Sequence, residues 1–485
     1  MNVSMIRYIL FQIMRIEGVL MLLPCLVAAY YRESVGVYYI SIAAALLIVG
    51  FVGCLFKPKN NIVYLKEGCI STALSWIIMS IFGCLPFCIS GEIPSFTDAL
   101  FETVSGFTTT GASILNDIES LSRTALMWRS FTHWVGGMGV LVFLLAVIPM
   151  SGGSNINLMR AESPGPSVGK LVPKLRYTAR ILYLIYFAMT VIETILLMCG
   201  GVGLYESLTI AFGTAGTGGF AILNTSFVTY TPYIQWVTAV FMMLFAVNFN
   251  AYYYVIMRQF RKAALMEEVR WFFLIVVAST GVIFINILKM YKTAFEALTH
   301  AFFQVTSIMS TTGFGSTDFD LWPTPSKFIL VLLMFIGACA GSTGGGIKVS
   351  RIVVLMKTIK KEIYSYIHPK IVRKVSMDGH PVEHDVIRSI NVYMATYIAI
   401  FAVSMFIVSF NGYDLITTFT AVTATINNIG PGLSLVGPTC NYSFLSGLTK
   451  YTLIFDMLAG RLELFPMLML FQPVLIKDLF KTHKK

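Results

Sequence analysis

Four short stretches rich in threonine and glycine are the part of this sequence best suited to binding an ion. They are TTTGAS (residues 108–113), GTAGTGGF (213–220), STTGFGS (310–316) and TINNIGPG (425–432). Glycine adopts a positive φ freely, so a loop of this composition can turn several backbone carbonyls toward one point. Carbonyl oxygens arranged around an axis can replace the hydration shell of a cation. One such stretch would be an ordinary polar turn, but four copies favour a shared cation site.

The residues expected to surround the cation occupy similar positions in the four stretches. They are Thr109, Thr110 and Gly111 in the first; Gly216, Thr217 and Gly218 in the second; Thr311, Thr312 and Gly313 in the third; and Asn427, Asn428, Ile429 and Gly430 in the fourth. Within this set, Gly111, Gly218, Gly313 and Gly430 are expected to be the hinge of each loop. The fourth stretch, with NNIG in place of TTG, diverges most from the others.

A glycine cluster in a later apolar segment predicts an interrupted helix. Each glycine costs about 1 kcal/mol in a helix interior. The cluster consists of Gly341, Gly344, Gly345 and Gly346. A phosphate-binding loop would need Lys directly after the last glycine, and Ile347 stands there instead. We therefore expect an intramembrane loop that controls the passage of the cation. The alternative is that the glycines allow close packing between helices.

Arg461 is a second candidate for control of passage, because it lies near the middle of the last apolar segment. A charge at that depth is a functional candidate by default. The nearest acids, Asp456 and Glu463, do not have the i±3 or i±4 spacing of helical neighbours. We favour a positive charge that faces the ion path, and an ion pair with another segment remains open.

The sequence carries no pattern typical of catalysis. HExxH and GxSxG motifs are absent, as are CxxC pairs among the eight cysteines. His133, beside Gly136 and Gly137, is expected to be a packing residue. These features predict a protein that is not an enzyme and that holds no tightly bound cofactor.

The composition indicates a membrane protein. Of 485 residues, 56% are hydrophobic and only 12% are charged, whereas soluble proteins carry about 25% charged residues. Several uncharged stretches are long enough to cross a hydrocarbon core of about 30 Å as helices. They include residues 37–56, 68–91, 233–257, 271–288, 328–347 and 389–413.

The basic residues predict the orientation of the chain. The net charge is +11, and Lys and Arg concentrate in every second loop, whereas residues 116–122, 224–232, 316–326 and 436–449 contain none. Retention of cationic loops in the cytoplasm explains the alternation and places both termini inside. No basic patch is interleaved with exposed aromatic residues, so we expect no nucleic-acid partner.

The four stretches also define a repeat. Each ends a short segment that is flanked by two apolar spans, and the basic loops all stay on one side only if each short segment is re-entrant. The non-helical backbone of a re-entrant segment is tolerated at membrane depth where protein buries it or water reaches it. We expect about ten spanning helices. The predicted units are 1–62 (two leading helices), 63–152, 153–262, 263–375 (with a broken second helix) and 376–485.

The sequence resembles the Trk/Ktr/HKT superfamily of potassium transport proteins over essentially its full length. The resemblance rests on the four loops, HWVGGMG (133–139), GSTGGGIKVSR (341–351), NNIGPG (427–432) and Arg461. The two leading spans fit the TrkH branch better than the Ktr branch.

This resemblance implies an all-α polytopic membrane protein of the bacterial inner membrane. Four tandem M1–P-loop–M2 repeats would surround a pseudo-fourfold pore, preceded by two extra transmembrane helices. The thirteen candidate residues above would bind potassium, the ion transported, and the glycine cluster and Arg461 would gate its passage. In the superfamily a serine at the first hinge accompanies sodium preference, so Gly111 indicates potassium.

The resemblance also implies a homodimer on a cytosolic, nucleotide-binding regulatory subunit of the TrkA type. Two other functions stay open. One is an alternating-access symporter that carries potassium with protons or sodium, although inverted repeats would mark it. The other is a membrane-embedded regulatory subunit without transport, which would predict degraded loops.

Overall fold

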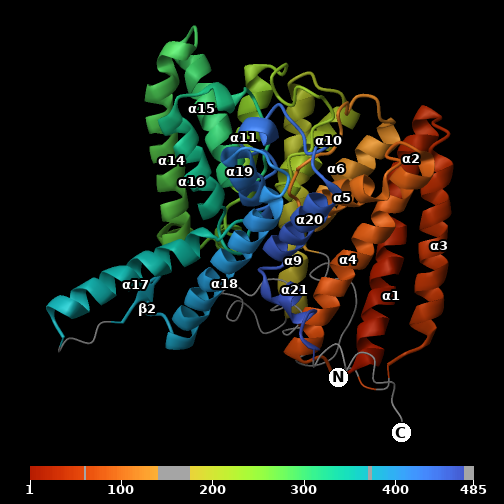
Figure 1. Cartoon of the computed structure of the whole chain (residues 1–485), viewed down its shortest axis with the longest axis horizontal. Coiled ribbons are helices and arrows are strands. Elements are labelled where there is room, and N and C mark those ends of the chain that lie inside the picture. The colour runs from red at the N-terminus through yellow and green to blue at the C-terminus, as the bar shows by residue number, and fades with distance from the viewer. Residues whose placement is uncertain (59, 61, 140–174, 370–373, 474–485) are drawn as a thin grey trace.

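The computed structural model describes the chain except residues 59, 61, 140–174, 370–373 and 474–485. The described part is almost entirely helical (Figure 1). Its strands form one short antiparallel pair, β1 (Ser376–Met377) and β2 (His380–Pro381). This architecture agrees with the expectation of an all-helical membrane protein.

The helices fall into a leading group and four similar groups. The leading group is α1 (Val3–Leu20), α2 (Leu22–Tyr31) and α3 (Gly36–Leu55). Four long helices follow at intervals: α4 (Leu65–Ser90), α9 (Leu175–Cys199), α14 (Glu267–Ile287) and α18 (His384–Ser409). After each comes a short helix: α5 (Phe96–Phe107), α10 (Leu204–Gly216), α15 (Ala294–Met309) and α19 (Leu415–Ile426).

One further helix, or two or three shorter ones, follow in each group. The first group has α6 (Arg123–Gly137), and the second has α11 (Pro232–Phe245), α12 (Phe249–Ile256) and α13 (Phe260–Leu265). The third has α16 (Thr324–Ile336) and α17 (Val349–Ile367), and the fourth has α20 (Gly447–Arg461) and α21 (Phe465–Met469). The interruption between α16 and α17 contains the glycine cluster, so the prediction of a broken helix there is confirmed.

Local capping explains where the short helices begin. The side chains of Ser95, Thr293 and Asp414 accept hydrogen bonds from backbone N–H groups in the first turns of α5, α15 and α19. Such caps satisfy donors that have no partner within the helix. These three helices therefore begin at definite residues, whereas α10 follows Gly203, which has no side chain to act as a cap.

Six helical stretches of the described chain are long and apolar enough to span a membrane, or seven if the bent pair α11–α12 is one span. The bend between those two helices is 91°. The second helices α6, α16 and α20 have only 15, 13 and 15 residues. Helix length alone therefore does not yield the ten spans expected from the sequence, because the second helices are short or interrupted.

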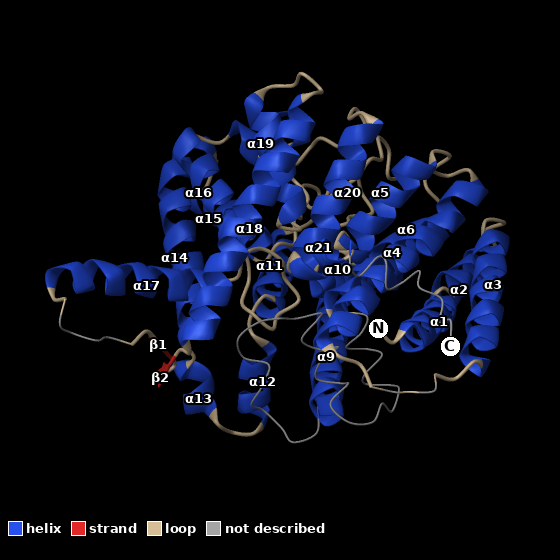
Figure 2. Ribbon diagram, turned by 60° about the horizontal axis from the view of Figure 1, so that its bottom comes forward, coloured by secondary structure: helices blue, strands red, loops and turns tan. Residues whose placement is uncertain are grey.

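The packing places the short helices in the interior and the long helices around them. All residues of α19 from Thr417 to Ile426 are buried except Phe419, whereas α14 exposes apolar side chains such as Val277 and Ile285. Apolar side chains on the outside suit contact with lipid. Helices α1–α3 lie at one edge and α14–α16 at the other, and α17 projects away from the body in both views (Figures 1 and 2).

Candidate functional site

The four glycine-rich stretches form four loops with the same backbone geometry. We call residues 108–111, 216–219, 310–313 and 427–430 the filter loops. A positive φ occurs at the second residue of each loop (Thr109, Thr217, Thr311 and Asn428) and again two residues later (Gly111, Gly219, Gly313 and Gly430). The third residue of each loop donates its N–H to the carbonyl five residues earlier, at 2.8–2.9 Å. The loops are therefore structural equivalents.

This geometry corrects the expected register of the second loop. Its hinge is Gly219, with φ +80°, and not Gly218. Gly218 corresponds to Thr110, because both donate N–H five residues back, Gly218 to Gly213 and Thr110 to Ser105. Gly216 therefore corresponds to Thr108. Adjacent glycines in the sequence GTGG gave no means of choosing the register.

The four loops close into a ring. A Cβ atom added at each hinge glycine would collide with the carbonyl oxygen of the next loop, where real Cβ atoms essentially never come within 3.0 Å. The approaches are 2.1 Å from Gly111 to Gly218 O, 2.0 Å from Gly219 to Thr312 O, 1.9 Å from Gly313 to Ile429 O and 2.7 Å from Gly430 to Thr110 O. Each loop thus contacts the next in chain order, and the fourth contacts the first.

Four helix ends lie at the ring. The helices α5, α10, α15 and α19 all end at the filter loops, so their C-terminal ends are close to it. A helix C-terminus carries a partial negative charge, which favours a cation. The oxygens are also confined by burial, since Thr110, Thr217, Thr312 and Asn428 are fully buried.

The divergent fourth loop is tied to its neighbours by side chains. The Asn428 side-chain amide donates to Thr110 Oγ1 at 3.0 Å and to Met457 O at 2.9 Å. Tyr442 donates its hydroxyl to Gly430 O at 2.7 Å. Asparagine at this position therefore links the fourth loop to the first, which a threonine could not do in the same way.

His133 packs against the first and second filter loops. Its Nδ1 lies 2.7 Å from Gly106 O, and its Nε2 accepts the Phe220 N–H at 3.2 Å. The imidazole is fully buried, and both ring nitrogens have partners. A Cβ on Gly218 would lie 2.2 Å from the ring. His133 is thus a hydrogen-bonded packing residue, as the sequence predicted.

A buried ion pair supports the same two loops. Arg129 Nε lies 2.5 Å from Glu102 Oε1, and Arg129 also donates to Ala221 O at 2.7 Å. The second oxygen of Glu102 accepts the Ile114 N–H at 2.9 Å. The pair joins α5 and α6 to the segments that follow the first two filter loops. A buried pair of this kind is stable only when its remaining hydrogen-bonding groups are satisfied, as they are here.

The interruption between α16 and α17 lies directly against the filter loops. We call residues 337–348 the glycine loop. The Gly345 N–H donates to Thr311 Oγ1 at 2.7 Å. A Cβ on Gly345 would lie 2.5 Å from Asn427 O, and one on Gly344 would lie 2.8 Å from Ser310 O. The glycine loop therefore fits against the third and fourth filter loops only because it has no side chains there.

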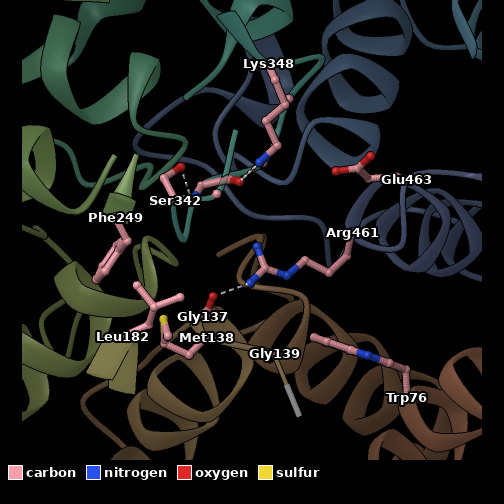
Figure 3. Close-up of a pocket in the computed structure, with 15 residues that line it drawn as sticks. Trp76, Gly137, Met138, Gly139, Leu182, Phe249, Ser342, Lys348, Arg461 and Glu463 are labelled. Carbon is pink, nitrogen blue, oxygen red and sulfur yellow. Dashed lines mark hydrogen bonds between the residues drawn. The ribbon is translucent and has the colours of Figure 1, made fainter. Parts of the chain in front are cut away.

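Arg461 is the last residue of α20, at a break in the chain, and does not lie within a continuous span as the sequence suggested. Its guanidinium donates to Thr343 O at 2.7 Å, to Gly136 O at 2.6 Å and to Gly137 O at 2.8 Å. One side chain thus joins the end of α6 to the glycine loop. Arg461 lines a cavity of about 130 Å³, and its side chain points toward Gly137 (Figure 3).

Two further charged residues line this cavity, Lys348 and Glu463, and the sequence did not predict a role for either one there. Lys348 donates from Nζ to Gly344 O within the glycine loop (Figure 3). Glu463 lines the same cavity and pairs with Arg351, near the start of α17. Both residues lie at interruptions of helices, which could have indicated a functional role. The pairing of Glu463 with Arg351, which is 112 positions away in the chain, could not be predicted from the sequence.

The chain is similar to known proteins along nearly its whole length. The sequence model of a family described as TrkH, a cation transport protein, matches residues 36–480. The chain is 33% identical over 468 residues to the Trk system potassium uptake protein TrkH of Escherichia coli (strain K12), covering 94% of this chain and 96% of the relative. It is 34% identical over 482 residues to the Trk system potassium uptake protein TrkH of Vibrio parahaemolyticus, covering 95% of this chain and 98% of the relative.

The fold is similar as well. The crystal structure of the potassium transporter TrkH from Vibrio parahaemolyticus matches with a TM-score of 0.86 and 32% identity. The match covers 97% of this chain and 99% of that chain. The likeness therefore extends from the leading helices to the last group.

Proposed function

Because the chain belongs to the TrkH family of cation transport proteins, we propose that it takes up potassium ions across the bacterial inner membrane through a channel-like pore. The pore would run along the axis of the four filter loops, with four M1–P-loop–M2 units around it. The family is one of transporters and not of enzymes, in agreement with the sequence analysis.

The observation that carries this proposal is the closed ring of hinge glycines. Each hinge approaches the carbonyl oxygen of the next loop so closely that a side chain is excluded. Four loops of the same geometry, at the ends of four buried helices, can direct carbonyl oxygens at one axis. Carbonyl oxygens of this kind can replace the water around a potassium ion. The expected ligands are the filter-loop residues, with Gly219 added as the second hinge.

The glycine loop and Arg461 are the proposed gate. Arg461 carries a fixed positive charge in a narrow cavity beside the filter loops, and a positive charge repels cations. It also donates a hydrogen bond to Thr343 in the glycine loop. A change in the glycine loop would therefore also change the position of this charge.

The cytoplasmic side is the proposed place of regulation. The glycine loop leads directly into α17, which projects from the body and carries Lys357, Lys360 and Lys361. A cytosolic nucleotide-binding subunit of the TrkA type that moved α17 would pull on the loop without touching the filter. The proposed assembly is a homodimer on such a subunit, with both termini in the cytoplasm.

The alternating-access symporter is less well supported. Such a transporter would have inverted repeats, with its site between two opposed halves. The four filter loops here have the same geometry and follow each other around one ring in chain order. This arrangement favours a single axial path.

A cation-competition flux assay tests the proposal. Purified protein in liposomes should take up rubidium as a tracer, with potassium competing strongly and sodium and lithium competing weakly. Equal competition by all alkali ions, or no uptake with potassium, would contradict the proposed filter. Copurification with a soluble nucleotide-binding ring tests the partner, and failure at every ionic strength would contradict it.

A further inference from the structure

The glycine loop is bonded to a second interrupted helix. Residues 246–248 separate α11 from α12, and we call them the α11–α12 break. Cys339 of the glycine loop donates its N–H to Ala246 O, and Phe249 donates its N–H to Gly341 O, both at 3.0 Å. Thr343 also donates its hydroxyl to Phe245 O at 3.1 Å. Two helix interruptions from different groups thus satisfy each other's backbone groups.

This pairing has a physical reason. Each interruption leaves backbone N–H and C=O groups without partners in its own helix. Within a membrane such groups are costly unless protein satisfies them. The bonds in both directions between the glycine loop and the α11–α12 break meet this need. If the glycine loop moved alone, it would leave unsatisfied groups on both sides.

One buried carboxylate holds these elements together. Glu268, near the start of α14, is only 4% exposed. Its Oε1 accepts the N–H of Ala340 at 2.6 Å and that of Ser350 at 3.1 Å. Its Oε2 accepts from the side-chain amide of Asn248 at 3.3 Å. A single residue on a long helix therefore binds the glycine loop, the first turn of α17 and the α11–α12 break.

A carboxylate side chain suits this role. Ser350 lies in the first turn of α17, where an anion interacts favourably with the helix dipole. Hydrogen bonds to an ionised acceptor are roughly twice as strong as those between neutral groups. Glu268 accepts hydrogen bonds from the N–H groups of Ala340, Ser350 and Asn248, so an amide in its place would turn a donor toward some of them.

We propose that Glu268 is the clamp that holds the glycine loop against the filter loops, and that the glycine loop and the α11–α12 break open as one unit. This inference rests on the proposed potassium pathway for its effect on flux. The coupling between the two segments stands on their hydrogen bonds alone. Glu268 is a positioning residue, because it acts through the loop and does not touch the ion.

The first experiment compares Glu268→Gln with Glu267→Gln in liposomes without any partner. Glu267 is the adjacent residue on α14, and its carboxylate binds Lys357 at 2.5 Å instead of the glycine loop. We expect Glu268→Gln to raise basal rubidium flux by on the order of tenfold, with unchanged preference over sodium. The Glu267→Gln control should stay near the parent. Equal flux from all three proteins would overturn the clamp.

The second experiment tests whether the two segments open together, by hydrogen–deuterium exchange. In Glu268→Gln, residues 337–348 and 246–252 should both exchange faster, whereas Glu267→Gln should leave them as in the parent. In the parent protein itself, the amides of Cys339 and Phe249 should exchange at similar rates, because one opening exposes both. Rapid exchange at Cys339 with Phe249 still protected would overturn the common unit, even if Glu268→Gln failed to fold.

A double variant gives a third measurement. Asn248→Ala removes the contact of Glu268 with the α11–α12 break but leaves its bonds to the glycine loop. If the segments act as one unit, Asn248→Ala raises basal flux, and the double variant with Glu268→Gln adds little. Additive increases would contradict the unit. Common exchange without any potassium flux would instead refute the proposed function and leave the coupling intact.

Discussion

Replacing Gly111 with serine is expected to reduce the preference for potassium over sodium. Gly111 has φ +76°, and a Cβ there would lie 2.1 Å from Gly218 O. Since real Cβ atoms essentially never come within 3.0 Å of an atom outside their own residue and its chain neighbours, one of the two loops has to move by roughly 1 Å. That movement displaces a carbonyl oxygen of the ring, on whose number and position selectivity depends.

The effect of backbone strain on selectivity must be separated from the effect of the displaced carbonyl oxygen. A residue other than glycine in the left-handed region costs roughly 1–2 kcal/mol wherever it lies. Gly201 provides the matched control, because it has φ +89° and no atom within 4 Å of an added Cβ. Gly201→Ser should therefore carry the strain without disturbing the filter loops. Gly219→Ser should behave like Gly111→Ser, because its Cβ would lie 2.0 Å from Thr312 O.

The assay is tracer uptake into liposomes with increasing potassium or sodium as competitor. We expect the ratio of the two inhibition constants to fall on the order of tenfold in Gly111→Ser, which corresponds to about 1.4 kcal/mol. Gly201→Ser should keep the parent ratio. If Gly111→Ser and Gly201→Ser give the same ratio, the hinge does not contribute to selectivity and the proposed ring is wrong.

Two further predictions concern the gate and the support of the filter. Arg461→Ala, like deletion of residues 344–346, should raise basal potassium flux without a partner while selectivity stays nearly the same, because the filter loops are untouched. If both variants fold and conduct no more than the parent, Arg461 and the glycine loop are only structural. Glu102→Gln should lower the free energy of unfolding by about 3–5 kcal/mol, since it leaves Arg129 buried without its counter-charge. Glu362→Gln, which removes an exposed pair with Lys361, should lower it by about 1 kcal/mol or less; equal losses in thermal unfolding would contradict this difference.

Local features of the sequence were enough to predict most helices. Apolar length predicted α3, α4, α14 and α18, but the uncharged stretch 233–257 is divided by the 91° bend between α11 and α12. The four threonine- and glycine-rich stretches predicted the short helices before them. The glycine cluster predicted the interruption between α16 and α17, since glycine destabilises a helix wherever it lies. His133 was expected to be a packing residue, and its two hydrogen bonds confirm it.

Other features depended on contacts between distant residues. The hinge of the second filter loop is Gly219 because its neighbour, Gly218, faces His133 and donates N–H to Gly213. Adjacent glycines have the same local preferences, so only the surrounding protein distinguishes them. Arg461 lies at a helix end because the chain turns at Glu463 and Leu464, both with positive φ, which their residue types disfavour.

The role of Glu268 illustrates the same limit. In the sequence it is one of two acids at the start of an apolar helix, and the first-turn position alone explains both. In the structure Glu267 forms an ion pair with Lys357, whereas Glu268 accepts hydrogen bonds from the glycine loop and from Asn248. Helix formation is determined by near neighbours in the chain, so sequence predicts it. The partner of a buried charge is determined by which interruptions the fold brings within hydrogen-bonding distance, and only the tertiary structure decides that.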